Sequence, residues 1–155
     1  GSGAATVGAL LYVLSLFYFN LKYNHRPEDS RLLPSLGAAN RITFLRGLLI
    51  CILAAFWGWM PLEGFEAGNP RAWWPGMLYI AAAVLDGVDG MIARRTHCRT
   101  RLGSNLDTQM DAFGLLVAVS VGIRMQQLPP VFLSVGLAYY LFTGAIAWRG
   151  KRLGP

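Results

Sequence analysis

The sequence predicts an all-α protein, a polytopic transmembrane bundle of about five membrane-spanning helices that forms a single domain over residues 1–155. Two observations carry this prediction. Of the 155 residues, 54% are hydrophobic and only 14% are charged, whereas about 25% charged residues are usual in a soluble domain. The apolar residues also gather in five segments of about 20 residues, the length that crosses the hydrocarbon core of a bilayer. A segment in lipid must satisfy its own backbone hydrogen bonds, so each is expected to be a helix.

Short connections rich in proline, glycine and asparagine separate the five segments, as is typical of turns and helix starts. The first segment has no basic leader followed by a cleavage pattern, so we interpret it as an extra N-terminal helix and not as a signal peptide. The connection 26–39 is either a short amphipathic helix on the inner membrane surface or a plain loop. The predicted helices are 3–23, 40–60, 72–94, 103–126 and 130–148.

Loop charges predict the orientation of the chain in the membrane. Basic residues concentrate in the first and third connections and in the C-terminal tail, which the positive-inside rule assigns to the cytoplasm. The N-terminus is then outside. Basic and non-basic connections alternate along the chain, which agrees with five membrane crossings. These patches account for the net charge of +6, so no nucleic-acid partner is predicted. The basic residues concerned are Lys22, Arg26, Arg31, Arg41, Arg95, Arg99, Arg101, Arg149, Lys151 and Arg152.

Four aspartates lie in or beside the third and fourth apolar segments, where carboxylates are costly. Asp86 and Asp89 are three residues apart, and Asp107 and Asp111 are four apart. Each pair therefore points from one face of its helix, and a short loop can bring the two pairs together. Converging carboxylates repel one another unless cations lie between them. Oxygen ligands suit Mg²⁺, Mn²⁺ or Ca²⁺ better than Zn²⁺, and a two-metal site of this kind suits phosphate chemistry.

The residues alone leave two alternatives to a metal site. The aspartates could form ion pairs with arginines, for which Arg46, Arg94 and Arg95 are the candidates. They could also line the path of a cation or proton carrier, because membrane aspartates often mark ion paths. Helix rise separates Asp86 from Arg94 by about 12 Å along the helix axis. The site is therefore expected to be a cavity that opens to the cytoplasm and reaches partway into the bilayer.

The four aspartates belong to a longer pattern over residues 86–111. It reads D-x-x-D-G-x-x-A-R, eight residues, then G-x-x-x-D-x-x-x-D, and it resembles the signature of the CDP-alcohol phosphotransferase family at every fixed position. These positions are Asp86, Asp89, Gly90, Ala93, Arg94, Gly103, Asp107 and Asp111. The resemblance covers about residues 35–155. Family members usually have six helices, whereas here the helix 3–23 precedes the expected first one and the expected last two do not follow.

The resemblance implies a membrane enzyme of phospholipid biosynthesis. Such an enzyme transfers a phosphatidyl or related group from a CDP-linked donor, such as CDP-diacylglycerol, to a small alcohol and releases CMP. It implies two divalent cations, Mg²⁺ or Mn²⁺ with Ca²⁺ as an alternative occupant, and a homodimer in membrane lipid. By position, Asp86, Asp89 and Asp107 would bind metal. Asp111 would contact the second metal and act as general base on the acceptor hydroxyl.

The resemblance also implies contacts to the nucleotide and its phosphates, some from an N-x-x-T-x-x-R-like start on the helix before the signature. The candidates are Gly90, Arg94, Thr100, Asn40, Thr43 and Arg46. Two of them have simpler alternatives, namely Asn40 as a helix cap and Arg46 as an interfacial side chain that reaches toward the headgroups. Gly87 and Gly103 flank the aspartates and are expected to allow close approach of a ligand or a neighbouring helix.

Overall fold

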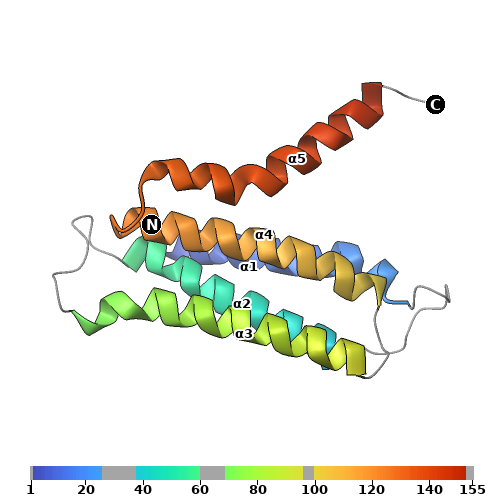
Figure 1. Ribbon diagram of the computed structural model, residues 1–155, viewed down its shortest axis with the longest axis horizontal. Coiled ribbons are helices and arrows are strands. Elements are labelled where there is room, and N and C mark those ends of the chain that lie inside the picture. The colour runs from blue at the N-terminus through green and yellow to red at the C-terminus, as the bar shows by residue number, and fades with distance from the viewer. Residues whose placement is uncertain (1, 26–37, 60–68, 96–99, 153–155) are drawn as a thin grey trace.

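A computed structural model of the chain describes residues 2–25, 38–59, 69–95 and 100–152. Every regular element in these ranges is helical, which confirms the predicted fold class. Helices α1 to α4 lie side by side as a bundle, and α5 folds back along α4 before its second half diverges from the other helices (Figure 1). The α-helices are α1 Ser2–Asn20, α2 Ala38–Trp59, α3 Trp74–Arg95, α4 Arg101–Arg124 and α5 Leu133–Arg152.

Short 3₁₀ turns shift the helix boundaries slightly from the predicted ones. Leu21–Tyr23 extends α1, Pro70–Trp73 precedes α3, and Pro130–Phe132 precedes α5. Both prolines stand at the first position of their turn, where the missing backbone N–H costs nothing. Most of the connection 26–39, for which an interfacial helix or a loop was predicted, lies outside the described residues, and only its last two residues are seen as the start of α2.

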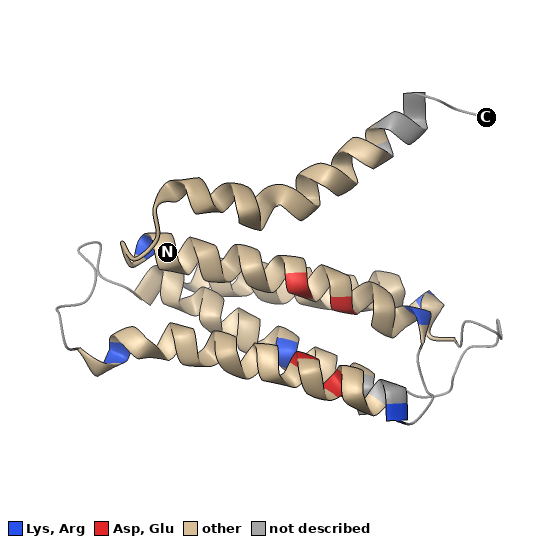
Figure 2. Cartoon of the chain, viewed as in Figure 1, with Lys and Arg blue, Asp and Glu red and all other residues tan. Residues whose placement is uncertain are grey.

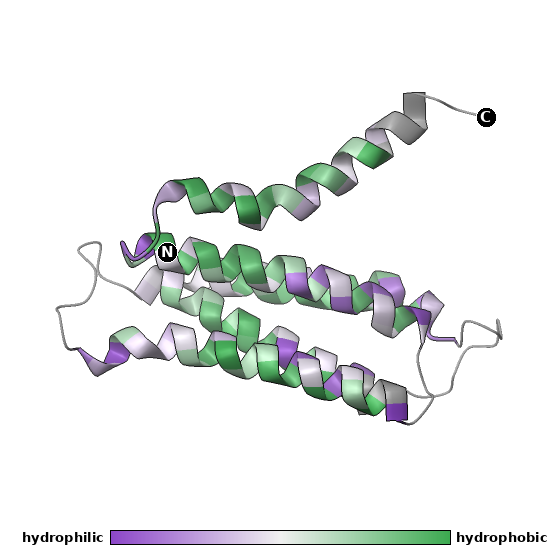
Figure 3. Cartoon of the chain, in the orientation of Figure 1, coloured by the Kyte–Doolittle hydropathy of each residue, from purple (hydrophilic) through white to green (hydrophobic). Residues whose placement is uncertain are grey.

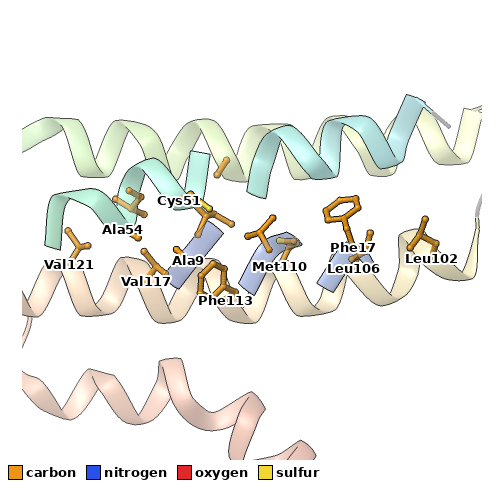
Figure 4. Packing of buried hydrophobic residues seen from close by; sticks show 14 of the residues in the cluster. Ala9, Phe17, Cys51, Ala54, Leu102, Leu106, Met110, Phe113, Val117 and Val121 are labelled. Atoms are coloured by element: carbon orange, nitrogen blue, oxygen red, sulfur yellow. The ribbon is translucent and has the colours of Figure 1, made fainter. Parts of the chain in front are cut away.

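Helix α2 occupies the middle of the bundle, because it packs against α1, α3 and α4. Side chains from α1, α2 and α4 interlock between these helices and supply most of the core (Figure 4). The most deeply buried are Val13, Leu53, Leu102, Leu106, Met110 and Val121. Large apolar side chains also cover much of the outer surface, as expected where the surrounding medium is lipid.

Four of the helical stretches are long and apolar enough to cross a membrane. They are Gly3–Tyr23, Asn40–Trp59, Pro70–Ile92 and Arg101–Arg124, and a fifth, Pro130–Ile146, is shorter within the described residues. Five tryptophans are exposed, and four of them lie near helix ends, where interfacial aromatics are expected. These five are Trp57, Trp59, Trp73, Trp74 and Trp148. The protein is therefore a multi-pass membrane protein.

The two ends of the bundle differ in polarity. At one end α1 and α3 finish while α2 and α4 begin, and hydrophilic residues gather toward this end of α3 and α4 (Figure 3). We call it the signature end, because the pattern over residues 86–111 runs through it. Arg95, Thr100 and the first turns of α4 lie at this end. The fold thus carries both halves of the aspartate pattern on adjacent helices at one level of the bundle.

Candidate active site

The four aspartates of the pattern lie on two helices, at a similar level of the bundle (Figure 2). They are also the four acidic residues within the described ranges. α3 carries Asp86 and Asp89, and α4 carries Asp107 and Asp111. Carboxylate oxygens of Asp86, Asp89 and Asp107 lie within 4.8 Å of one another. Asp111 stands outside this group of three and is joined to it through an arginine.

That arginine is Arg46, which enters the site from α2. Its Nη1 donates to Asp86 and, over 3.3 Å, to Oδ1 of Asp107, while its Nη2 donates to the Asp107 carbonyl at 3.2 Å and to Oδ1 of Asp111 at 3.0 Å. Arg46 is only 2% exposed, so it is a member of the site and does not reach toward the headgroups. The ion pairing considered from the sequence therefore occurs at Arg46, and the ion pairs recorded for the described residues all involve it.

One arginine does not balance four carboxylates. If all are ionised, the cluster keeps a net charge of −3, from four negative groups and one positive group. Asp89 is the most buried of the four at 4% exposed, and its Oδ2 accepts a hydrogen bond of 2.8 Å from the Thr43 hydroxyl. Uncompensated charge at this depth is costly. The oxygen-only donor set and its excess negative charge therefore fit divalent cations.

A second group of predicted residues lies at the signature end. Thr100 caps α4, since its Oγ1 accepts from the backbone N–H of Gly103 at 3.0 Å. Asn40 donates to the same hydroxyl oxygen over 3.4 Å. It lies two residues inside α2, so it does not cap its own helix, and its side chain faces α4. A Cβ atom on Gly103 would lie 2.9 Å from Oδ1 of Asn40, so α2 and α4 approach each other closely at this glycine.

The remaining predicted residues follow Asp86 along α3. Gly90 stands directly after Asp89 and is half-buried. Gly87 is exposed, and a Cβ atom there would meet no described atom within 4 Å. The close approach that was predicted at Gly87 is therefore not made by a neighbouring helix among the described residues. Arg94 lies in the last turn of α3, but its side chain falls outside the described part of the structure.

Two adjoining cavities lie between α3 and α4, and the smaller one is lined by aspartates. The smaller, about 230 Å³, is lined by Arg46, Asp86 and Asp111 at one end and by Tyr79 and Leu115 at the other. Tyr79 and Leu115 also line the larger cavity of about 780 Å³, which continues toward the opposite end of the bundle and is mostly apolar. Sequence reasoning missed Tyr79, although a polar aromatic residue two helical turns before Asp86 falls on the same helix face.

The sequence model of the CDP-alcohol phosphatidyltransferase family matches residues 36–152, well over half of the chain. The chain belongs to this family. Neither the search of curated proteins nor the search of solved structures found a match. As a CDP-alcohol phosphatidyltransferase, the protein is in the class of transferases of substituted phosphate groups. The matched region includes the four aspartates and Arg46 but leaves α1 outside.

Proposed function

We propose that the protein transfers the phosphatidyl group of a CDP-linked lipid, with CDP-diacylglycerol as the expected donor, to a small alcohol and releases CMP in phospholipid biosynthesis. The observation that carries the proposal is the convergence of the four signature aspartates, three of them paired with Arg46, within helices that match the family. General acid–base chemistry and charge stabilisation at a phosphate need this combination of carboxylates and guanidinium at one point.

Asp86, Asp89 and Asp107 are the residues proposed to hold one divalent cation, Mg²⁺ or Mn²⁺, and Asp111 is proposed to contact a second. Their support is the group of three carboxylates within 4.8 Å and the excess negative charge around it. The bound cations would supply stabilisation of the charge that develops on the phosphate oxygens. Thr43 orients Asp89 through its hydroxyl hydrogen bond, and Arg46 orients the other three carboxylates.

Asp111 is proposed as the general base. Its side chain is 61% exposed and lines the smaller cavity, so an acceptor hydroxyl can reach it. As the alcohol oxygen forms its bond to the lipid-bearing phosphorus, the anhydride P–O bond breaks and CMP leaves with the bonding electron pair. The hydroxyl proton passes to the Asp111 carboxylate. The hydrogen bond from Arg46 holds this carboxylate in place before the transfer.

The other candidate residues divide into three groups. Gly90 and Arg94 are proposed to contact the nucleotide and its phosphates, since a glycine allows close approach and a guanidinium suits phosphate. Asn40 and Thr100 are proposed to act at a distance, because their side chains bond to each other and close the α2–α4 contact. Gly87 remains a proposed point of ligand approach, since its exposed position leaves room there.

A lipid-linked donor is favoured by the cavities between α3 and α4. The aspartates lie at one end of this path, and Trp73, Gly76 and other mostly apolar residues line its continuation. Acyl chains would lie along the apolar part while the diphosphate reaches the carboxylates. We propose that the signature end faces the cytoplasm, with the N-terminus outside, because the basic loops predicted from the sequence join the helices there.

The cation carrier gains no support from the described residues. A carrier needs polar access from both faces, whereas the four described acidic residues all lie in the half of the bundle nearer the signature end. A homodimer is proposed from the family alone. Light scattering of the detergent-purified protein would test it, with twice the mass of the 17.0 kDa chain expected after subtraction of the detergent.

Purified protein in mixed micelles with CDP-diacylglycerol tests the proposed reaction. Glycerol phosphate, inositol phosphate, serine and a choline-like alcohol are offered one at a time, and both CMP and the lipid product are measured. One acceptor is expected to raise CMP release well above the rate without acceptor, with one lipid product per CMP. Release that no alcohol stimulates, or that yields free phosphatidic acid with every acceptor, would contradict transfer to an alcohol.

A further inference from the structure

Helix α1 lies outside the region that matches the family, yet it packs against α2, which carries Arg46, and α4, which carries Asp107 and Asp111. Val13 of α1 is fully buried in the core beside α2 and α4. Asn20, the last residue of α1, is a buried polar residue that faces α4. Both contacts reach residues of α4 that are close in sequence to Asp107 and Asp111, so α1 touches the rear of the site at two points.

The first contact is steric. Gly47 directly follows Arg46, and a Cβ atom on Gly47 would lie 2.9 Å from Cγ1 of Val13 and 3.5 Å from the Met110 side chain. Met110 in turn directly precedes Asp111. Val13 thus fills the space where the backbone next to Arg46 meets the residue next to Asp111. The missing side chain of Gly47 is what allows this close approach.

The second contact is polar. Nδ2 of Asn20 donates to the Leu16 carbonyl at 2.8 Å and to Oε1 of Gln109 at 3.5 Å, and its Oδ1 accepts from Nδ2 of Asn105 at 3.4 Å. Asn105 and Gln109 each lie two residues from Asp107, about 200° around the helix. They therefore occupy the face of α4 that points away from the site. Just beyond α1, the His25 carbonyl accepts from the backbone N–H of Arg101, the first residue of α4, at 3.1 Å.

We propose that α1 is a positioning element for the candidate active site. Asn20 fixes the rotation of α4 about its axis, and Val13 fixes the spacing of α2 and α4 against α1. Together they set the separation between Arg46 on α2 and the two carboxylates on α4, and with it the affinity of the carboxylates for divalent cations. The inference rests on the proposed function for its catalytic consequence, but the cation affinity can be measured without turnover.

The polar contact is tested by Asn20→Leu, which keeps a similar volume and removes the hydrogen bonds to α4. Binding of Mn²⁺ to the full chain in detergent is measured by calorimetry, and kcat and KM for CDP-diacylglycerol are measured in parallel. Substitution of an outer residue that orients a metal ligand typically lowers metal affinity by about 10- to 100-fold. Asn20 is more distant from the carboxylates, so we expect about fivefold weaker Mn²⁺ binding. A fall in kcat with little change in KM is expected, and Asn20→Gln should recover much of both.

The matched control is Phe19→Leu, because Phe19 is adjacent on α1 but 68% exposed on the outer surface. It should leave both Mn²⁺ binding and kcat at the wild-type values. A general weakening of α1 would affect the control and Asn20→Leu alike, whereas positioning through Asn20 separates them.

The steric contact is tested by a double-mutant cycle. Gly47→Ala should push α1 away and weaken Mn²⁺ binding, and Val13→Ala added to it should restore binding by removing the clash. Val13→Ala alone leaves a cavity and lowers the melting temperature. Recovery of Mn²⁺ affinity in the double variant, despite that cavity, is a result that a purely stabilising role of α1 would not give.

The two proposals fail in different ways. If the wild-type protein releases CMP and binds Mn²⁺ but Asn20→Leu matches it in both, the positioning role of Asn20 is wrong and the proposed function stands. If the wild-type protein binds Mn²⁺ without releasing CMP, the proposed function fails, and weaker binding by Asn20→Leu still supports positioning. If Asn20→Leu does not fold, the Gly47 and Val13 cycle decides, and an affinity unchanged by Gly47→Ala overturns the inference.

Discussion

Arg46 and the three carboxylates that it contacts form a compact cluster of charge within the described part of the chain. The side chain of Arg46 is 3% exposed, whereas the side chains of Asp86, Asp107 and Asp111 are 39%, 50% and 61% exposed. The positive charge of Arg46 is thus withdrawn from solvent, whereas the three carboxylates are partly open to the cavity. A planar guanidinium can serve several acceptors at fixed angles, which an ammonium group cannot. We therefore regard Arg46 as the residue that holds the two aspartate-bearing helices in register.

Removal of this guanidinium is expected to destabilise the protein. Breaking a fully buried ion pair costs about 3–5 kcal/mol, and the partial exposure of the three partners lowers our expectation for Arg46→Ala to about 1–3 kcal/mol. Mn²⁺ should raise the melting temperature of Arg46→Ala more than that of the wild type, because the cation replaces lost positive charge. Differential scanning fluorimetry in detergent measures both. An equal Mn²⁺ effect in the two proteins would contradict this role, and Arg46→Lys should fall between them.

Asp111→Asn tests the proposed general base. The amide keeps the shape of the side chain and its acceptor oxygen for Arg46, but it cannot take a proton. CMP release is expected to fall by about 100-fold or more, while binding of the CDP-linked donor changes by only a few-fold. Thr108→Ala is the control, because Thr108 is exposed on the same helix and its hydroxyl donates to the Ser104 carbonyl. Turnover near the wild-type rate in Asp111→Asn would show that another group accepts the proton.

Asp89 and Thr43 allow the metal-binding role to be separated from simple hydrogen bonding. Asp89→Asn removes a carboxylate from the group of three within 4.8 Å and should weaken Mn²⁺ binding by about 10- to 100-fold. Thr43→Val removes only the hydrogen bond that orients Asp89, so a smaller loss is expected. Calorimetric titration with Mn²⁺ ranks the two. A larger loss in Thr43→Val than in Asp89→Asn would contradict direct binding by Asp89.

At the scale of the helices, the contact between α2 and α4 depends on Gly103. A Cβ atom there would lie 2.9 Å from Asn40 and 3.3 Å from Thr100, so Gly103→Ala should force the start of α4 away from α2. Overpacking of this kind costs about 1–3 kcal/mol, and thermal unfolding measures it. Gly144→Ala is the control, because a side chain in α5 at that position meets nothing described within 4 Å. Equal melting temperatures for Gly103→Ala and the wild type would show that α2 and α4 are not closely held there.

The helices could be predicted from the sequence because lipid permits little else for apolar segments of such length. Ends marked by Pro70, Thr100 and Pro130 follow from capping and turn chemistry. The contacts between helices could not be predicted. Helices that are apolar on all sides have no amphipathic face that indicates a neighbour, since lipid and protein interior are equally apolar. The three-way pairing of Arg46 and the contact of Asn20 with α4 therefore appear only in the folded arrangement.

The candidate site could likewise be predicted only in part from the sequence. Helical spacing was enough to predict that Asp86 and Asp89 share one face and that Asp107 and Asp111 share another. The local pattern could not show that Asp111 stands apart from the other three, or that Asn40 bonds to Thr100 across 60 residues. Such features depend on the relative depth and rotation of separate helices, which no local periodicity encodes.

At the scale of the whole molecule, the proposed orientation can be tested with the native cysteines. Cys51 is buried in α2, and Cys98 falls in the third connection, which the loop charges assign to the cytoplasm. A membrane-impermeant maleimide should label the protein in inside-out vesicles and not in intact cells. Cys98→Ser should abolish that labelling and Cys51→Ser should not. Labelling from outside intact cells would reverse the proposed orientation.

We propose that a single cluster of carboxylates and Arg46 uses divalent cations to transfer a phosphatidyl group from a CDP-linked lipid. The most direct test follows CMP release by the purified full chain in vesicles that contain CDP-diacylglycerol and the preferred alcohol. The protein is first treated with a chelator, and Mn²⁺ or Mg²⁺ is then titrated back. Chelation should abolish CMP release, and the cation should restore it in the wild type but not in Asp111→Asn. CMP release that persists without divalent cations, or that is equal in the two proteins, would contradict this mechanism.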